Sequence, residues 1–162
     1  MQKHLVPIVA TVFVMLFLWL SAVPLISWYE LTAYHQELAD RSFQWHHSGI
    51  RNYSFDFEYL DSKTRPVPGP IRIHVQDSKF INAHRIDTGE LVDLSGMADV
   101  PRSIESAFSI AAELLEKHPY KFNIEYDAAL HYPTVISVSF SDSESAGATY
   151  NIKRLKTADH SP

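Results

Sequence analysis

The sequence contains no cysteine. Disulfide bonds and a lipid-modified N-terminal cysteine are therefore excluded, although the cellular compartment is not identified. Long runs of Lys and Arg are also missing, and the net charge is −5, which argues against nucleic acid as a partner. No glycine-rich phosphate loop and no Gly-x-Ser-x-Gly motif occurs. The sequence therefore lacks both of these signatures of catalysis.

Ionisable side chains are missing from Leu5 to Trp28. As a helix this run would measure roughly 36 Å, enough to cross a hydrocarbon core of about 30 Å. The alternative is a cleaved secretory signal, which would leave a secreted protein of the same fold. No Ala-x-Ala site is present, and Pro24 follows the small residues Ser21 and Ala22. We therefore expect a retained membrane anchor.

The charges that flank this run predict its orientation. Lys3 precedes it, and Glu30, Glu37 and Asp40 follow it. The positive-inside rule then places the N-terminus in the cytoplasm and the C-terminal domain outside, as in a single-pass protein of a bacterial inner membrane. The predicted partition is a cytoplasmic tip and anchor at 1–28, an amphipathic helical connector at 29–45, an extracytoplasmic domain at 46–156 and a flexible tail at 157–162.

Alternating apolar and polar residues predict most of the remaining elements. "NYSFDFEYL" reads as a half-buried strand, and "IRIHV" and "KFINAHRI" read as a hairpin that turns at Asp77-Ser78. An apolar stripe after Ser103 predicts a helix over 103–118, with Ser103 as its N-cap and Pro119 as its stop. Three further strands follow: "YKFNIEY", "TVISVSF" and "ATYNIKRL".

The expected fold class is α+β. It comprises an N-terminal transmembrane helix followed by a small antiparallel sheet packed with one or two helices, in the order α-βββ-α-βββ.

The segment between the fourth and fifth expected strands has an unusual composition. Tyr126-Asp127 closes one strand and Tyr132-Pro133-Thr134 opens the next. Asp is a turn former that bonds nearby backbone amides, and Pro suits the first residue of a strand. We therefore expect a structural corner here, and this interpretation requires no catalysis.

The same segment, "IEYDAALHYPTVISV", resembles the Tyr-Asp … Gly-Tyr-Pro-Thr signature of bacterial envelope domain-of-unknown-function family 6174. Trp45 followed by "NYSFDF", "IHVQDSKFINA" and "SIESAFSIAAELL" resemble further parts of that family in the same order, so that the resemblance covers about 44–155. It implies a secreted, lipid-anchored or membrane-anchored domain with no established activity. The residues that carry it are proposed as a structural motif: Tyr126, Asp127, Tyr132, Pro133, Thr134, Trp45, Tyr53 and Phe108.

The chain departs from that family pattern at three places. A Cys-x-Cys found in many members is absent, His131 replaces the glycine before Tyr-Pro, and the acidic cluster before the last strand is reduced to "SDSESAG". No role of those cysteines or acidic residues is carried over.

Two kinds of chemistry remain as alternatives to a binding or structural role. Asp87-Thr88-Gly89 matches the short aspartic protease motif, but that chemistry needs two such carboxylates and only one copy is present. Of the nine histidines, all but His4 lie beyond the apolar run, and no His-x-x-x-His spacing fixes a metal cluster. His74 and His84 would face each other only if the hairpin register allowed it. The other histidines are His35, His46, His47, His118, His131 and His160.

We therefore expect a binding or structural domain rather than an enzyme, with no catalytic residue, no cofactor and no metal. The expected partners are the lipid bilayer, through residues 5–28, and an envelope protein or peptide met at an exposed sheet edge. The alternative is an envelope hydrolase that uses Asp87, Asp127 or a histidine.

Overall fold

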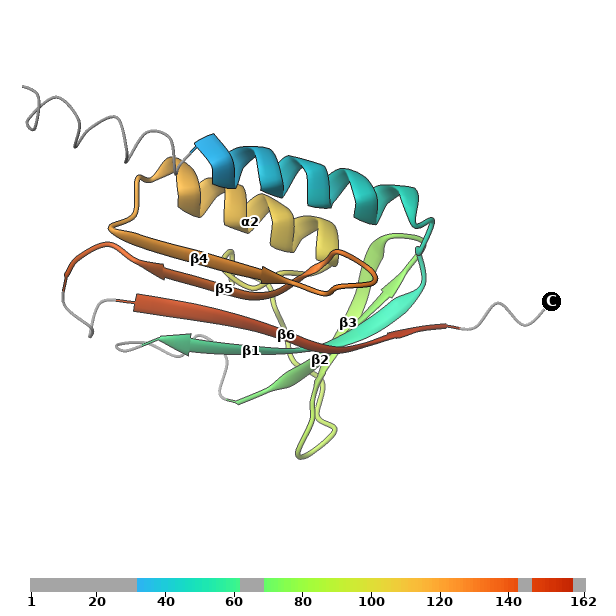
Figure 1. Cartoon of the computed structure of the whole chain (residues 1–162). Coiled ribbons are helices and arrows are strands. Elements are labelled where there is room, and N and C mark those ends of the chain that lie inside the picture. The colour runs from blue at the N-terminus through green and yellow to red at the C-terminus, as the bar shows by residue number, and fades with distance from the viewer. Residues whose placement is uncertain (1–31, 62–68, 143–146, 159–162) are drawn as a thin grey trace, which may run out of the picture. The chain divides into compact units, whose positions relative to one another are not determined.

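The computed structural model describes residues 32–61, 69–142 and 147–158 (Figure 1). The chain divides into two compact units, Met1–Glu37 and Leu38–Pro162. Residues 32–47 are helical and are called the first helix below. Residues 32–37 of this helix belong to the first unit and residues 38–47 to the second. The fold and the site described below belong to the second unit.

Six strands form one antiparallel sheet. They are β1 (Tyr53–Asp61), β2 (Ile71–Gln76), β3 (Lys79–Arg85), β4 (Lys121–Tyr126), β5 (Pro133–Ser139) and β6 (Gly147–Thr157). Their spatial order is β3-β2-β1-β6-β5-β4, so the first and last strands of the chain pair at the centre. The edges are β3 and β4, one from each half of the chain.

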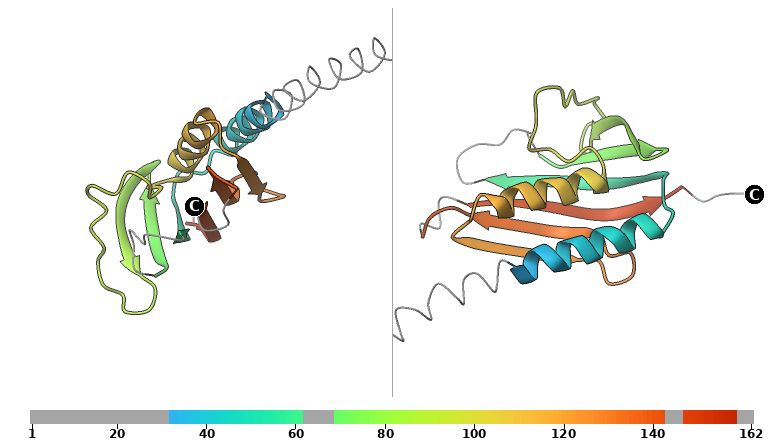
Figure 2. Two further views of the ribbon diagram at one scale, coloured as in Figure 1. Left: turned by 90° about the vertical axis from the view of Figure 1, so that its left-hand side faces the viewer. Right: turned by 90° about the horizontal axis from the view of Figure 1, so that it is seen from above.

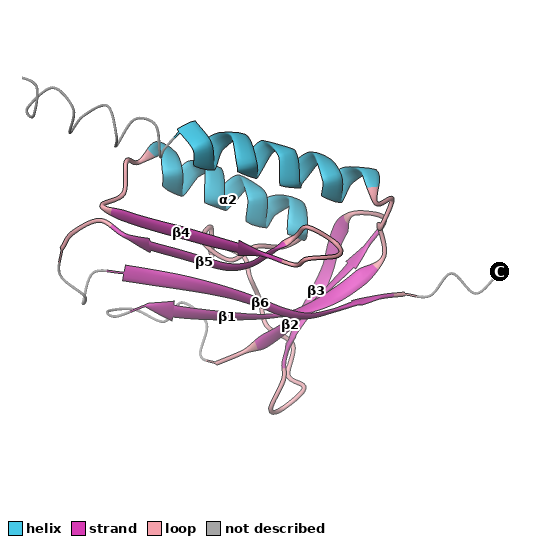
Figure 3. Ribbon diagram, viewed as in Figure 1, coloured by secondary structure: helices cyan, strands magenta, loops and turns pink. Residues whose placement is uncertain are grey.

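The helix α2 (Ile104–Glu116) lies on the same face of the sheet as residues 38–47 (Figures 1 and 2). Ser103 caps it, because its hydroxyl accepts the amide of Ser106 at 3.2 Å while the Ser106 hydroxyl accepts the amide of Ser103 at 2.9 Å. The predicted N-cap and helix are thus confirmed. Between β3 and α2, residues 86–103 form neither a helix nor a strand (Figure 3).

The core lies between this sheet face and the two helices. Its largest side chains are less than 2% exposed. Burial of each bulky apolar side chain among them stabilises the fold by about 1.5–3 kcal/mol. They come from the helices (Trp45, Ile104, Leu115), the N-terminal strands (Phe55, Phe57, Ile71, Ile73) and the C-terminal strands (Ile136, Ile152). The alternation expected for β1, with aromatic residues inward, is confirmed.

The predicted fold class is wrong in its transmembrane helix, and the predicted single-pass location in a bacterial inner membrane is wrong with it. Within 32–61, 69–142 and 147–158, the structure contains no helix with the length and apolar character needed to cross a membrane. The helix that ends at residue 47 is amphipathic: Leu38 and Trp45 are buried, whereas Asp40 is exposed. The predicted span itself, residues 5–28, lies outside the described residues.

Candidate functional site

The face of the sheet opposite the helices carries polar side chains in two cross-strand rows. Residues that pair across neighbouring strands project from the same face. The first row is Lys156, Ser54, His74 and Asn82, from β6, β1, β2 and β3. The second row is Lys153, Asp56, Arg72 and His84, from the same four strands. Both rows come from segments far apart in the sequence.

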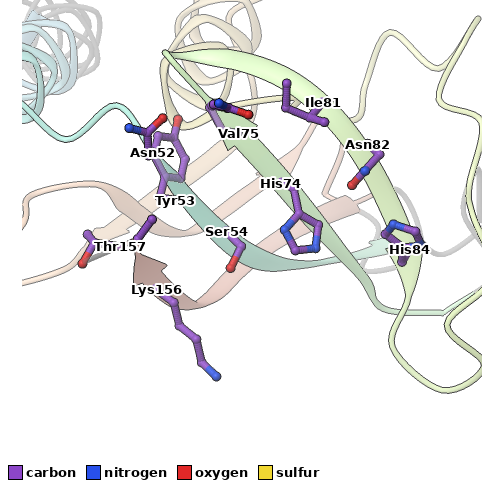
Figure 4. Close-up of a pocket in the computed structure, with 12 residues that line it drawn as sticks. Asn52, Tyr53, Ser54, His74, Val75, Ile81, Asn82, His84, Lys156 and Thr157 are labelled. Atoms are coloured by element: carbon purple, nitrogen blue, oxygen red, sulfur yellow. The ribbon is translucent and has the colours of Figure 1, made fainter. Parts of the chain in front are cut away.

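A hollow of about 640 Å³ lies over the first row (Figure 4). Its polar lining includes Ser54, His74, Asn82, His84 and Lys156, and none of the described residues that line it is acidic. Hydroxyl, amide and ammonium groups donate hydrogen bonds, and an imidazole does so in either protonation state. The hollow is therefore rich in donors and has a positive charge at its rim.

Two imidazole rings form one wall of the hollow. The rings of His74 and His84 lie 5.9 Å apart between centroids and meet edge to face at 80°. They are diagonal neighbours, because His74 pairs with Asn82 while His84 pairs with Arg72. The pKa of His74 is lowered by burial, and further by His84 and Arg72. The uncharged imidazole is thereby favoured at neutral pH.

His84 and Asn82 have distinct hydrogen-bonding states. His84 Nδ1 lies 3.2 Å from the carbonyl oxygen of Gly89. The segment that follows Gly89 returns alongside β3, where the Val92 amide donates a hydrogen bond to the Ala83 carbonyl. Asn82 Oδ1 is buried and has no hydrogen-bond partner among the described residues. A buried acceptor without a partner is costly, so this oxygen is a candidate ligand atom.

Asp56 is a buried carboxylate in the second row, with a side chain that is 5% exposed. It accepts two hydrogen bonds from Arg72, at 2.7 and 3.2 Å, and contacts Arg154. These bonds raise the pKa of Arg72 further. Arg154 adopts φ 52° at the point where the pairing register between β1 and β6 shifts. The two arginines make this part of the face cationic even after Asp56 is paired.

The carboxylates considered for a hydrolase are not brought together. Asp87 follows β3 and is bound by Arg85 at 2.6 and 2.9 Å, and this hydrogen bonding lowers the pKa of Asp87. Asp127 follows β4, which is the opposite edge of the sheet. The topology thus separates the two carboxylates, and an aspartic protease pair does not form between them.

Asp127 lies in the turn between β4 and β5. Its Oδ1 accepts the amides of Ala129 at 3.0 Å and Leu130 at 2.8 Å, while its own amide donates to the carbonyl of Tyr132 at 2.8 Å. Pro133 opens β5 and is fully buried opposite Tyr126. These backbone contacts hold the connection in one conformation.

Aromatic contacts connect this turn to the two helices. Tyr132 is buried and meets Trp45 edge to face at 6.1 Å. The ring of Tyr126 stacks on Phe108 at 6.5 Å and lies 5.1 Å from the Arg41 guanidinium. Thr134 is half-buried in β5.

His131 occupies a backbone conformation that favours glycine. Its φ is 63°, and its Nδ1 lies 2.9 Å from Arg41 Nη1. Glycine adopts this left-handed backbone without strain, whereas residues that carry a Cβ adopt it less readily.

Trp45, Tyr53 and Glu105 connect the first helix, β1 and α2 through a polar network. Glu105 accepts Trp45 Nε1 at 3.0 Å and the Tyr53 hydroxyl at 2.9 Å, while that hydroxyl accepts the Ile104 amide at 2.9 Å. Burial raises the pKa of Tyr53, so the hydroxyl remains a donor.

Among the described residues, no group of three or more His, Cys, Asp or Glu side chains is arranged to hold a metal ion. His46 and His47 end the first helix, His118 follows α2, and His35 is exposed in the first helix. His160 lies outside the described residues. Within the described strands, His74 and His84 are the one pair of histidines whose rings contact each other.

Sequence reasoning did not single out Ser54, Asn82, Lys156, Asp56 or Arg72. The alternation of β1 and β2 predicts which of their residues share the polar face. Only the pairing of β1 with β6 brings Lys156 beside Ser54. The sequence therefore predicts which residues of a strand share the polar face, but not which strands bring these residues together.

Fold and site define a class: a six-stranded antiparallel sheet with helices on one face and a donor-rich hollow on the other. The chain belongs to DUF6174, a family of unknown function whose model matches residues 37–157. Comparison with curated proteins and with solved structures finds no match. Any activity must therefore be argued from the site itself.

Proposed function

We propose that this domain is a binding module that takes a ligand with a carboxylate group in the hollow of the helix-free face. The observation that carries the proposal is the lining: Ser54, His74, Asn82, His84 and Lys156 offer donors, and no acidic residue lies among the described lining residues. Carboxylates accept several hydrogen bonds at once, and those from charged donors are the strongest.

The charge distribution supports an anionic ligand. The chain as a whole has a net charge of −5. On β1, β2 and β6, the helix-free face nevertheless carries Lys153, Lys156, Arg72 and Arg154. The acidic residues there are the buried Asp56 and the partly exposed Glu58, which lies 3.9 Å from Lys153. A locally positive region on an acidic protein attracts anions and orients their approach.

The position of the hollow also suits a peptide. β3 is an edge strand, and the returning segment pairs with it only at Ala83 to Arg85 among the described residues. Ile81, which also lines the hollow, is 52% exposed. An apolar side chain next to a carboxylate would contact Ile81 while the carboxylate enters the hollow. The ligand is thus either a peptide C-terminus or a small free acid.

Calorimetric titration of the full chain in EDTA tests the proposal. The probes are isovalerate, N-acetyl-Ala-Ala-Leu with a free C-terminus, and the C-terminal amide of the same peptide. We expect binding of one or both free acids and none of the amide. Isovalerate alone would indicate a small acid, whereas tighter binding of the peptide acid would indicate a peptide.

Two lysine variants locate the binding. Lys156→Gln should weaken binding of the free acid by about tenfold, which corresponds to the loss of one charge-assisted hydrogen bond. Lys121→Gln, an exposed lysine of β4, is the matched control and should not change it. Equal binding of acid and amide, an unchanged affinity in Lys156→Gln, or no binding of any probe would refute the proposal.

A further inference from the structure

The hairpin of β2 and β3 brings three possible ligand atoms to one space. His74 and Asn82 are directly paired, and His84 is the diagonal neighbour of His74. In Figure 4 the side chains of His74, Asn82 and His84 point into the hollow from the two strands. The Asn82 Oδ1 atom is buried there without a hydrogen-bond partner among the described residues.

We propose that His74 and His84 bind a divalent transition-metal ion, with Asn82 Oδ1 as a third ligand and the remaining positions open to water. The site is argued from its own atoms and does not depend on the proposed function. The further step, in which the carboxylate of the ligand takes an open position on the ion, rests on the proposed function and deepens it.

The separation of the rings fits a shared ion. Metal–nitrogen distances of about 2.0–2.1 Å place an imidazole centroid about 3.2 Å from the ion, so two rings on one ion have centroids at most about 6.4 Å apart. The observed separation of His74 and His84 is 5.9 Å, with the planes nearly perpendicular.

The tautomer of His84 also fits. Its Nδ1 lies 3.2 Å from the carbonyl oxygen of Gly89 and must donate to it, so Nε2 is the ring nitrogen that would face an ion. A ligating histidine commonly donates its other N–H to a carbonyl in this way, and that bond fixes the ring. His74 projects from the neighbouring strand β2, and its ring meets that of His84 edge to face. The geometry of the two rings and the orientation of His84 therefore suit a shared ion.

The donor set selects the class of ion. Two imidazole nitrogens and one amide oxygen suit Cu²⁺, Ni²⁺ and Zn²⁺, whereas Mg²⁺ and Ca²⁺ prefer sites made of oxygen. Cu²⁺ binds most tightly to such a set in the usual order of stability. Arg72 and Lys156 carry positive charge near the site, but Asp56 pairs with Arg72, and a bound carboxylate would neutralise further charge.

Copper binding to the full chain tests the site. The protein is purified without a histidine tag, freed of metal by EDTA, dialysed into buffer without carboxylates and titrated with CuCl₂. We expect one equivalent of Cu²⁺ and an electron paramagnetic resonance spectrum with coupling to imidazole nitrogen. His74→Gln and His84→Gln should each weaken binding by at least about tenfold.

Two further variants make the test specific. His46→Gln, an exposed histidine at the end of the first helix, is the matched control and should bind copper as the wild type does. Asn82→Asp should tighten binding, because a charged carboxylate replaces the amide oxygen as the third ligand. Thermal midpoints of all variants establish that each is folded.

Absence of stoichiometric binding, or an affinity unchanged in either folded histidine variant, would overturn the site. Carboxylate binding in EDTA without copper binding would leave the proposed function standing and remove this inference. If copper binds but no carboxylate binds, either in EDTA or with Cu²⁺ present, the metal site stands and the proposed function is refuted. If both are correct, saturating Cu²⁺ should tighten carboxylate binding, and the same factor should appear in the copper affinity.

Discussion

Removal of the Glu105 carboxylate should destabilise the fold more than its partial exposure suggests. In Glu105→Ala, Trp45 Nε1 and the Tyr53 hydroxyl both lose their acceptor. Trp45 is 1% exposed and Tyr53 is 3% exposed, so water replaces the carboxylate poorly. A buried donor left without a partner costs about 1–3 kcal/mol, and the two together cost about 2–6 kcal/mol. A domain of this size has a free energy of unfolding of about 5–15 kcal/mol.

Urea denaturation of the full chain, followed by circular dichroism, measures this change. Glu113→Ala is the matched control, because Glu113 is an exposed glutamate of the same helix, and it should remain within about 0.5 kcal/mol of the wild type. Glu105→Gln keeps one acceptor oxygen and should cost less than Glu105→Ala. A double-mutant cycle with Tyr53→Phe should give a coupling free energy of about 0.5–3 kcal/mol. If Glu105→Ala unfolds at the same urea concentration as Glu113→Ala, the network does not stabilise the fold and the reasoning fails.

Two further predictions concern the turn between β4 and β5. Asp127→Ala should lower the free energy of unfolding by about 1.5–3 kcal/mol, because two amides lose a charged acceptor. Asp127→Asn should cost less, because it keeps an acceptor oxygen. Equal losses for the two variants in a urea melt would contradict the role of the side chain as acceptor. His131→Gly should be more stable than His131→Val by at least about 1 kcal/mol, because a β-branched residue is strained at φ 63°. If His131→Val has the higher melting midpoint, this backbone position is not constrained.

Local elements followed from the sequence because their signals are local. Ser103 and the apolar stripe predicted α2, and its capping box is formed by residues three apart in the chain. Asp77-Ser78 predicted the hairpin turn, and both residues adopt the positive φ that such a turn requires. The transmembrane helix in the predicted fold class was wrong, since the described residues contain an amphipathic helix and none that suits a membrane.

The candidate site depended on pairings that no local pattern encodes. Alternation in β1 and β2 determines which residues share a face, but it leaves the order of the strands open. Only the insertion of β6 beside β1 places Lys156 next to Ser54, and only the irregular register between β2 and β3 places His84 diagonal to His74. The sequence by itself therefore determined the helix α2, the turns and the polarity of each strand. The tertiary structure decided which polar residues meet, because that choice depends on hydrogen bonds between strands that are distant in the chain.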